Sequence, residues 1–180
     1  MAKKALIAMS GGVDSSVSAY LIKNQGYEST GITLKLFDNE ETDEKQEKAC
    51  CSLDDIEDAR SVCYNLGIPY YVYNFKDSFK ENVIDRFISA YENGTTPNPC
   101  IDCNRYIKFE KLIRRAEELD FDYVVTGHYA IIEYDENLQR YILKKATDIT
   151  KDQSYVLYSL TQQQLAKTLF PLGKMTKNEV

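Results

Sequence analysis

The chain has 180 residues, of which 43% are apolar, and its 22 basic and 28 acidic side chains leave a net charge of −6. That length is typical of one globular domain that buries a sizeable core without disulfides. The sequence has no apolar run near the roughly 20 residues of a membrane span and no signal segment, so we expect a cytoplasmic protein with no membrane partner. The acidic balance argues against nucleic-acid binding through bulk charge.

The predicted elements alternate between strands and helices. We expect strands at 6–9, 30–37, 69–75 and 123–126, helices at 14–24, 53–66, 79–91 and 107–119, a hairpin from 130–134 and 140–144, and loops at 39–48 and 93–99. This order predicts an α/β fold, a doubly wound and mainly parallel sheet with helices on both faces, plus a small β-hairpin. Ligands of such sheets bind at the carboxyl ends of the strands.

The most informative segment joins the first predicted strand to the first helix and reads Ser10-Gly11-Gly12-Val13-Asp14-Ser15-Ser16. A strand, a glycine turn and a helix start direct backbone N–H groups and the positive end of a helix dipole at one point, where a phosphate can bind. The lysine of a Walker P-loop is missing, and an ordinary Ser/Asp helix cap is the simpler alternative. Asp14 either caps the helix or holds a Mg²⁺ ion that bridges to the phosphates.

The same segment resembles, at every position, the pyrophosphate loop (PP-loop) of the N-type ATP pyrophosphatases. These enzymes cleave ATP between its α and β phosphates and adenylate a substrate oxygen. The resemblance implies a Rossmann-like PP-loop domain over residues 1–180 that uses ATP and Mg²⁺. It leaves the substrate open, because members of this superfamily adenylate purine bases, amino acids and tRNA nucleotides.

Cys100 and Cys103 form a C-x-x-C pair in a proline-stiffened loop, just before the helix expected from residue 107. In a reducing compartment such a pair indicates catalysis or metal binding rather than a structural disulfide. One hypothesis is a nucleophile or sulfur carrier, its thiolate stabilised by the dipole of that helix and by Arg105 or Lys108. An equally favoured one is a zinc or iron–sulfur ligand pair. A pair of small residues with no special role is the third alternative.

Several further motifs resemble the tRNA-specific 2-thiouridylases, which make 2-thiouridine at the wobble position of certain tRNAs. In chain order they are Thr96-Pro97-Asn98-Pro99, Cys103-Asn104, Ile107-Lys108-Phe109, Thr126-Gly127-His128-Tyr129-Ala130, Lys151-Asp152-Gln153-Ser154-Tyr155 and Phe170-Pro171-Leu172-Gly173. The likeness covers the chain from Lys4 to its end. It implies tRNA as a partner, together with a sulfur-carrier protein or cysteine desulfurase as the persulfide donor.

The resemblance also implies a role for each matching residue. ATP would contact the loop residues Ala8, Met9, Ser10, Gly11, Gly12, Val13, Asp14, Ser15 and Ser16, and also Leu34 and Gly127. Cys103 would be the catalytic cysteine, with Asp14 serving the chemistry on ATP. The target base would approach Pro97, Asn98 and Pro99, and tRNA would contact His128, Lys151, Asp152 and Gln153. From chemistry alone, His128 is better explained as a hydrogen-bonded structural imidazole.

Two features depart from the family pattern. The family often has aspartate at the position of Cys100, so the C-x-x-C pair keeps an iron–sulfur cluster on Cys100 and Cys103 open. The family enzyme is also about twice this length, with a persulfide-carrying cysteine, a middle domain and a β-barrel domain downstream of Val180. Residues 176–179 read as a helix start, which suggests truncation.

The implied reaction is ATP-dependent. The C2 oxygen of the wobble uridine attacks the α-phosphate of ATP and releases pyrophosphate. Persulfide sulfur then replaces the adenylated oxygen, AMP departs, and Cys103 assists sulfur release and ends in a disulfide with the downstream cysteine. The alternatives are an ATP pyrophosphatase that adenylates a small metabolite, and an ATP- or tRNA-binding fragment without turnover.

Overall fold

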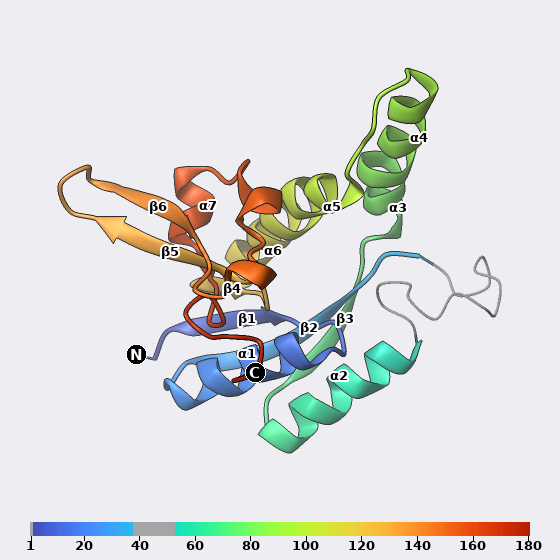
Figure 1. Cartoon of the computed structure of the whole chain (residues 1–180). Coiled ribbons are helices and arrows are strands. Elements are labelled where there is room, and N and C mark those ends of the chain that lie inside the picture. The colour runs from blue at the N-terminus through green and yellow to red at the C-terminus, as the bar shows by residue number, and fades with distance from the viewer. Residues whose placement is uncertain (1, 38–52) are drawn as a thin grey trace.

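The computed structural model describes residues 2–37 and 53–180. In these residues, parallel strands form one sheet in the order β3-β2-β1-β4-β7 (Figure 1). Its strands are β1 (Lys4–Ala8), β2 (Glu28–Lys35), β3 (Tyr70–Asn74), β4 (Tyr123–Val125) and β7 (Thr168–Leu169). A separate antiparallel hairpin pairs β5 (Ala130–Asp135) with β6 (Arg140–Lys145). The predicted α/β fold with a small hairpin is confirmed.

Helices cover both faces of this sheet (Figure 1). On one face lie α1 (Val13–Asn24) and α2 (Leu53–Leu66). The other face is covered by two helical segments, the first built from α3 (Lys76–Phe79), η2 (Lys80–Ile84) and α4 (Asp85–Glu92), the second from α5 (Pro99–Asp102), η3 (Cys103–Lys111) and α6 (Leu112–Glu118). The turns η4 (Ile149–Lys151) and η5 (Ser154–Leu157) and helix α7 (Gln162–Ala166) follow the hairpin.

The central strand β1 divides the core into two layers because its side chains alternate between the faces. Ala5 and Ile7 are fully buried against α1 and α2, in a cluster that includes Ile22. Leu6 is fully buried on the opposite face, in a cluster that includes Phe109 of η3. Each fully buried aliphatic side chain of this size contributes about 1.5–3 kcal/mol relative to exposure. The apolar run that predicted the first strand therefore packs this strand into both layers of the core.

Several predicted boundaries are wrong. The helix expected at 107–119 begins eight residues earlier, at Pro99, because Asn98 caps it and proline is favoured in a first turn. The helix expected at 79–91 begins at Lys76 and contains the π-helical stretch η2. Helix α7 and the two-residue strand β7 were not predicted. The expected loop at 39–48 lies outside the described residues.

None of the helices in the described ranges is long and apolar enough to cross a membrane.

Candidate functional site

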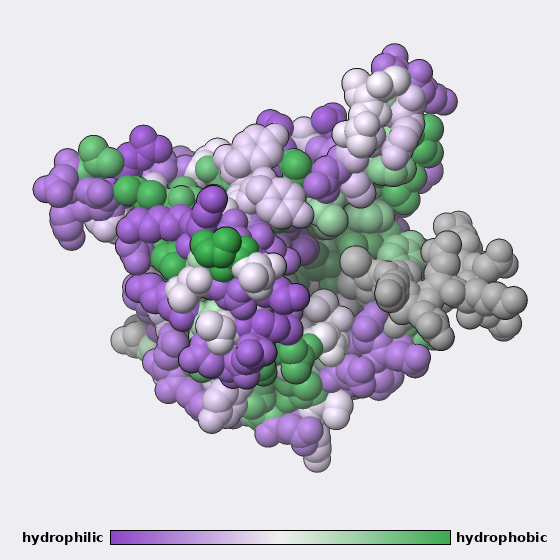
Figure 2. Space-filling view, in the orientation of Figure 1, coloured by the Kyte–Doolittle hydropathy of each residue, from purple (hydrophilic) through white to green (hydrophobic). Residues whose placement is uncertain are grey.

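The topology brings the loops after β1 and β4 together. Strand β1 pairs with β2 on one side and with β4 on the other, so the direction of winding reverses between β1 and β4. Ligands of doubly wound sheets bind at such a switch point. The two loops touch, because a Cβ atom added to Gly127 would lie 3.0 Å from the backbone carbonyl carbon of Asp14. Figure 2 shows that the surface is hollowed between the lower layer, which holds α1 and α2, and the layer above it.

The N-terminus of α1 has no side-chain cap. Its N-cap residue is Gly12, in extended conformation, and no side chain accepts a hydrogen bond there. The alternative in which Asp14 or a serine caps this helix is therefore wrong. The first-turn N–H groups of a helix have no intrahelical acceptor, and Ser10, Gly12 and Val13 are exposed. This end of α1 can therefore accept an anion.

Gly11 allows the loop to turn. Its φ is 77°, in the left-handed region, and an added Cβ would lie 2.6 Å from the backbone oxygen of Asp55 at the start of α2. A larger residue at this position would be strained and would also collide with backbone. The turn and the neighbouring helix together explain why glycine is needed here.

The serines of the loop hold its shape. The Ser15 hydroxyl is buried, donates to the Gly12 carbonyl at 2.8 Å, and accepts from the Ser10 N–H at 3.2 Å. The Ser16 hydroxyl donates to the same carbonyl at 3.1 Å. These bonds fix the carbonyl of Gly12 and leave the outer surface of the turn open. The predicted contacts of Ser15 and Ser16 with ATP remain predictions.

Asp14 joins the loop to two distant segments. Its Oδ1 accepts a hydrogen bond from the Tyr129 hydroxyl at 2.9 Å and pairs with Lys177 Nζ at 2.6 Å. The Lys177 backbone N–H donates to Asp148 Oδ2 at 3.0 Å, which orients the segment that presents the lysine. Burial, followed by the hydrogen bond to Asp14, raises the pKa of Tyr129, so this residue remains a donor. Sequence reasoning did not identify Tyr129 or Lys177 as site residues, because neither is close to Asp14 in the chain.

Leu34 and Gly127 lie at the carboxyl ends of their strands, as predicted. Leu34 is near the end of β2 and is buried in the core cluster that contains Leu6 and Phe109. Gly127 directly follows β4 and is packed against the start of α1. Leu34 presents little exposed surface, so the predicted contacts of both residues with ATP remain predictions.

His128 is a buried, hydrogen-bonded side chain. Only 8% of it is exposed, its Nδ1 lies 2.6 Å from the Thr126 hydroxyl, and its ring packs in one aromatic cluster with Phe109 and Phe170. Burial and, secondarily, the positive charge of Lys108 hold its pKa well below the usual 6.5. This matches the structural imidazole expected from chemistry alone. Its contact with tRNA stays a prediction.

The segment at 151–153 braces the loop after β4. Gln153 Oε1 accepts from the Tyr129 N–H at 3.0 Å, and the Gln153 N–H donates to the Tyr129 carbonyl at 2.9 Å. Asp152 Oδ1 accepts from the Ala146 N–H at 2.8 Å. These two side chains are therefore used within the protein, while Lys151 is exposed. The contacts of these three residues with tRNA remain predictions.

The cysteine pair lies inside a helix rather than before one. Asn98 is exposed, and its Oδ1 accepts from the Cys100 N–H at 3.0 Å. Cys100 is exposed in the first turn, and Cys103 is half-buried one turn later, against the core cluster that contains Phe109. The predicted dipole of a helix starting at residue 107 is therefore not available to Cys103. Asn104, beside it, is 4% exposed, and its Oδ1 has no hydrogen-bond partner in the described structure.

The metal hypotheses differ in how well the residues fit them. One carboxylate together with substrate phosphates is a usual way to hold Mg²⁺, and Asp14 at the helix N-terminus meets that requirement. An iron–sulfur cluster is usually held by four protein ligands. Within residues 2–37 and 53–180, no group of three or more His, Cys, Asp or Glu residues is placed to hold a metal ion. Cys100 and Cys103 alone do not complete such a ligand set.

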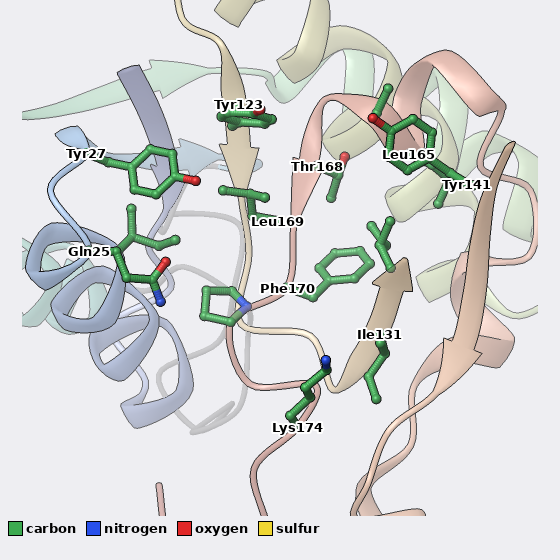
Figure 3. Close-up of a pocket in the computed structure, with 14 residues that line it drawn as sticks. Gln25, Tyr27, Tyr123, Ile131, Tyr141, Leu165, Thr168, Leu169, Phe170 and Lys174 are labelled. Atoms are coloured by element: carbon green, nitrogen blue, oxygen red, sulfur yellow. The ribbon is translucent and has the colours of Figure 1, made fainter. Parts of the chain in front are cut away.

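A pocket of about 330 Å³ lies away from this site. Figure 3 shows Tyr27 and Tyr123 on one side of it, with Leu165 and Tyr141 on the other and Lys174 below. Tyr27 and Tyr123 lie at the amino-terminal ends of β2 and β4, whereas Phe170, Pro171 and Lys174 follow β7 at its carboxyl end. The pocket therefore runs beside β4 and β7, and none of its lining residues belongs to the glycine loop.

The burial of His128 predicts how the protein responds to acid. Because folding lowers the pKa of the ring, the unfolded chain binds a proton below about pH 6.5 that the folded chain does not. The free energy of unfolding should therefore fall as the pH drops below 6.5, by up to about 1.4 kcal/mol per pH unit from this group. His128 is the only histidine, so a single ring signal in a proton NMR titration reports it. A titration midpoint of the His128 ring near pH 6.5 would contradict its burial.

Comparison with known proteins agrees with this geometry. The family described as "tRNA methyl transferase HUP domain" matches residues 3–180. The "tRNA-specific 2-thiouridylase MnmA 1" of Thermoanaerobacter pseudethanolicus is 58% identical over 178 residues, which is 98% of this chain and 49% of that protein. The MnmA of Clostridium kluyveri is 55% identical over 180 residues, which is 100% of this chain and 50% of that protein.

Among solved structures, the "predicted subunit of tRNA methyltransferase" from Methanocaldococcus jannaschii covers 98% of this chain and 71% of its own length, with a TM-score of 0.55 and 15% identity. At that identity the likeness concerns the fold alone. The chain spans about half the length of the curated relatives it matches. With nearly all of its residues matched, the chain belongs to the tRNA methyl transferase HUP domain family, to which its PP-loop and parallel sheet had pointed.

Proposed function

We propose that this chain is the ATP-binding, base-activating part of a tRNA-specific 2-thiouridylase. The observation that carries the proposal is the uncapped, exposed N-terminus of α1, with a glycine turn before it and the Gly127 loop packed against it. Relatives named as 2-thiouridylases, at 55–58% identity over essentially the whole chain, support the choice of tRNA as substrate.

The charges around the loop suit a triphosphate. The helix dipole and the unpaired first-turn N–H groups attract phosphate oxygens. Lys177 supplies the positive charge that a Walker loop would take from its own lysine, and it already lies at Asp14. Asp14 would hold Mg²⁺, which supplies further charge neutralisation on the phosphates. The ion pair is half-exposed and contributes at most about 1 kcal/mol to stability, so Lys177 can exchange Asp14 for a phosphate at little cost.

The reaction activates an oxygen that is otherwise a poor leaving group. The C2 oxygen of the wobble uridine attacks the α-phosphate of ATP, a new O–P bond forms, and pyrophosphate leaves. Sulfur from a persulfide then bonds to C2, and AMP leaves with the former carbonyl oxygen. Placing the base in the site costs a few kcal/mol or less, because an anticodon loop is already single-stranded.

Cys103 assists the sulfur transfer. Its thiolate attacks the persulfide, releases the terminal sulfur to C2, and is left in a disulfide with the persulfide-carrying cysteine. The family resemblance puts that second cysteine outside residues 1–180. The half-buried position of Cys103, which leaves part of its side chain accessible, supports this role. Pro97, Asn98 and Pro99 precede it and would contact the target base, and a sulfur-carrier protein or cysteine desulfurase would supply the persulfide.

The first test concerns Asp14. Asp14→Asn keeps an oxygen that accepts from Tyr129 but removes the charge that holds Mg²⁺ and Lys177. Pyrophosphate release in the presence of unmodified tRNA should fall on the order of 100-fold, while the melting temperature changes little because the ion pair is half-exposed. Release at the wild-type rate would refute the role of the loop. If the wild-type chain released pyrophosphate equally fast with and without tRNA, a small-metabolite substrate would be favoured instead.

A second test separates Lys177 from its neighbours. Lys177→Gln should weaken Mg·ATP binding roughly tenfold, because one phosphate contact of about 1.4 kcal/mol is lost. Lys174→Gln is the matched control, since Lys174 pairs with Glu133 on the surface and lines a pocket that contains no residue of the glycine loop. Equal effects of the two substitutions on the ATP dissociation constant would contradict a specific role for Lys177.

Cys103→Ser tests the sulfur step. In a polypeptide of the relatives' full length, this variant should still release pyrophosphate but form no measurable 2-thiouridine, because a hydroxyl does not attack a persulfide. Nucleoside mass spectrometry of the tRNA measures the product. Thiolation at an unchanged rate would remove Cys103 from the mechanism and leave the ATP site unaffected.

A further inference from the structure

Cys100 has no role in the mechanism above, although it lies one helical turn from Cys103. The backbone between them is helical, with φ and ψ of −65° and −41° at Asp102 and −60° and −47° at Cys103. In an α-helix, residues three apart have Cα atoms about 5 Å apart and lie on the same face. Disulfides join Cα atoms about 4.4–6.8 Å apart. The two cysteines are therefore spaced for a bond to each other.

The first turn is fixed at this spacing. Asn98 accepts a hydrogen bond from the Cys100 N–H through its side chain and from the Ile101 N–H, at 3.1 Å, through its carbonyl. Pro99 fixes the backbone at the first helical position. A turn that is already ordered loses little further entropy when a bond closes across it.

The two thiols differ in access. Cys100 is exposed, whereas Cys103 is half-buried against the core. Solvent therefore reaches Cys100 more easily than Cys103. Cys63, by contrast, is fully buried, and burial raises the pKa of its thiol to about 11, so it stays unreactive.

We propose that Cys100 is a resolving cysteine, which attacks a mixed disulfide on Cys103 and closes a Cys100–Cys103 disulfide within the first turn of the helix. This inference rests on the role proposed for Cys103. Sulfur transfer leaves Cys103 bonded to the sulfur of another thiol, and that bond has to be broken before the next cycle. A thiol one turn away performs this step at an effective concentration on the order of millimolar or higher.

The step is an exchange without net oxidation. The Cys100 thiol loses its proton to solvent, and its sulfur bonds to Cys103 Sγ. The disulfide bond between Cys103 and the other thiol breaks, and the departing thiolate takes up a proton. The pair then holds the disulfide, and a dithiol reductant returns both cysteines to thiols by supplying two electrons and two protons.

Glutathione disulfide is a suitable probe, because it forms a mixed disulfide on an accessible thiol without ATP or tRNA. The reduced 180-residue chain is incubated with it, quenched in acid, treated with N-ethylmaleimide and digested with trypsin. Cleavage after Arg86 and Arg105 gives a peptide, residues 87–105, in which Cys100 and Cys103 are the only cysteines. Residues 61–76 form another peptide whose sole cysteine is Cys63, which serves as an internal control.

The expected product is peptide 87–105 lighter by two hydrogens, with no maleimide and no glutathione, while Cys63 remains a thiol. In Cys100→Ser, glutathione should remain on Cys103 and leave roughly tenfold more slowly or worse when a monothiol is added. Cys103→Ser is the matched control and should trap the adduct on Cys100.

The proposal would be overturned if the wild-type peptide accumulated glutathione without forming the Cys100–Cys103 disulfide. It would also be overturned if Cys100→Ser lost glutathione as fast as the wild-type chain. A third contradicting result would be that Cys100 and Cys103 react only after a chelator removes a metal. Because the assay uses neither ATP nor tRNA, a failure of the proposed thiouridylase activity would leave its outcome unchanged, and the two proposals fail separately.

Discussion

The structure around the PP-loop depends on one carboxylate. Asp14 receives Tyr129 from the loop after β4 and Lys177 from the far end of the described chain, across 115 and 163 residues of sequence. Tyr129 is in turn bonded through its backbone to Gln153, and Lys177 through its backbone to Asp148. The motifs at 126–130 and 151–155 therefore hold in place the loop that we propose binds ATP.

This arrangement explains how a carboxylate can lie inside a loop that we propose binds phosphate. A lone Asp14 would repel a triphosphate, but with Lys177 beside it the local charge is balanced. The open N-terminus of α1 then contributes the net attraction. Because the ion pair is half-exposed, its charges can be redistributed onto phosphates and Mg²⁺ when a nucleotide binds, without a large loss of stability.

Local patterns predicted the parts of the protein that depend on local chemistry. The apolar run before Ser10 and the glycines after it specified strand β1, the turn and α1, because each is determined within a few residues. The contacts of Asp14 with Tyr129 and Lys177 could not be predicted, since only the folded topology brings them together. Strand β7 is two residues long and is defined by its pairing with β4, so it leaves no periodic signal. The two prolines of the segment 93–99 predict a loop, although Pro99 is the first residue of the helix that holds both Cys100 and Cys103.

The central claim is that the turn between β1 and α1 binds the phosphates of ATP. Isothermal titration of the chain with Mg·ATP measures this directly, with Gly127→Ala as a variant whose added Cβ pushes the β4 loop against the backbone of Asp14. The account predicts one ATP bound per chain and a clear loss of affinity in the variant. Absence of any heat of binding in the wild-type chain would contradict it.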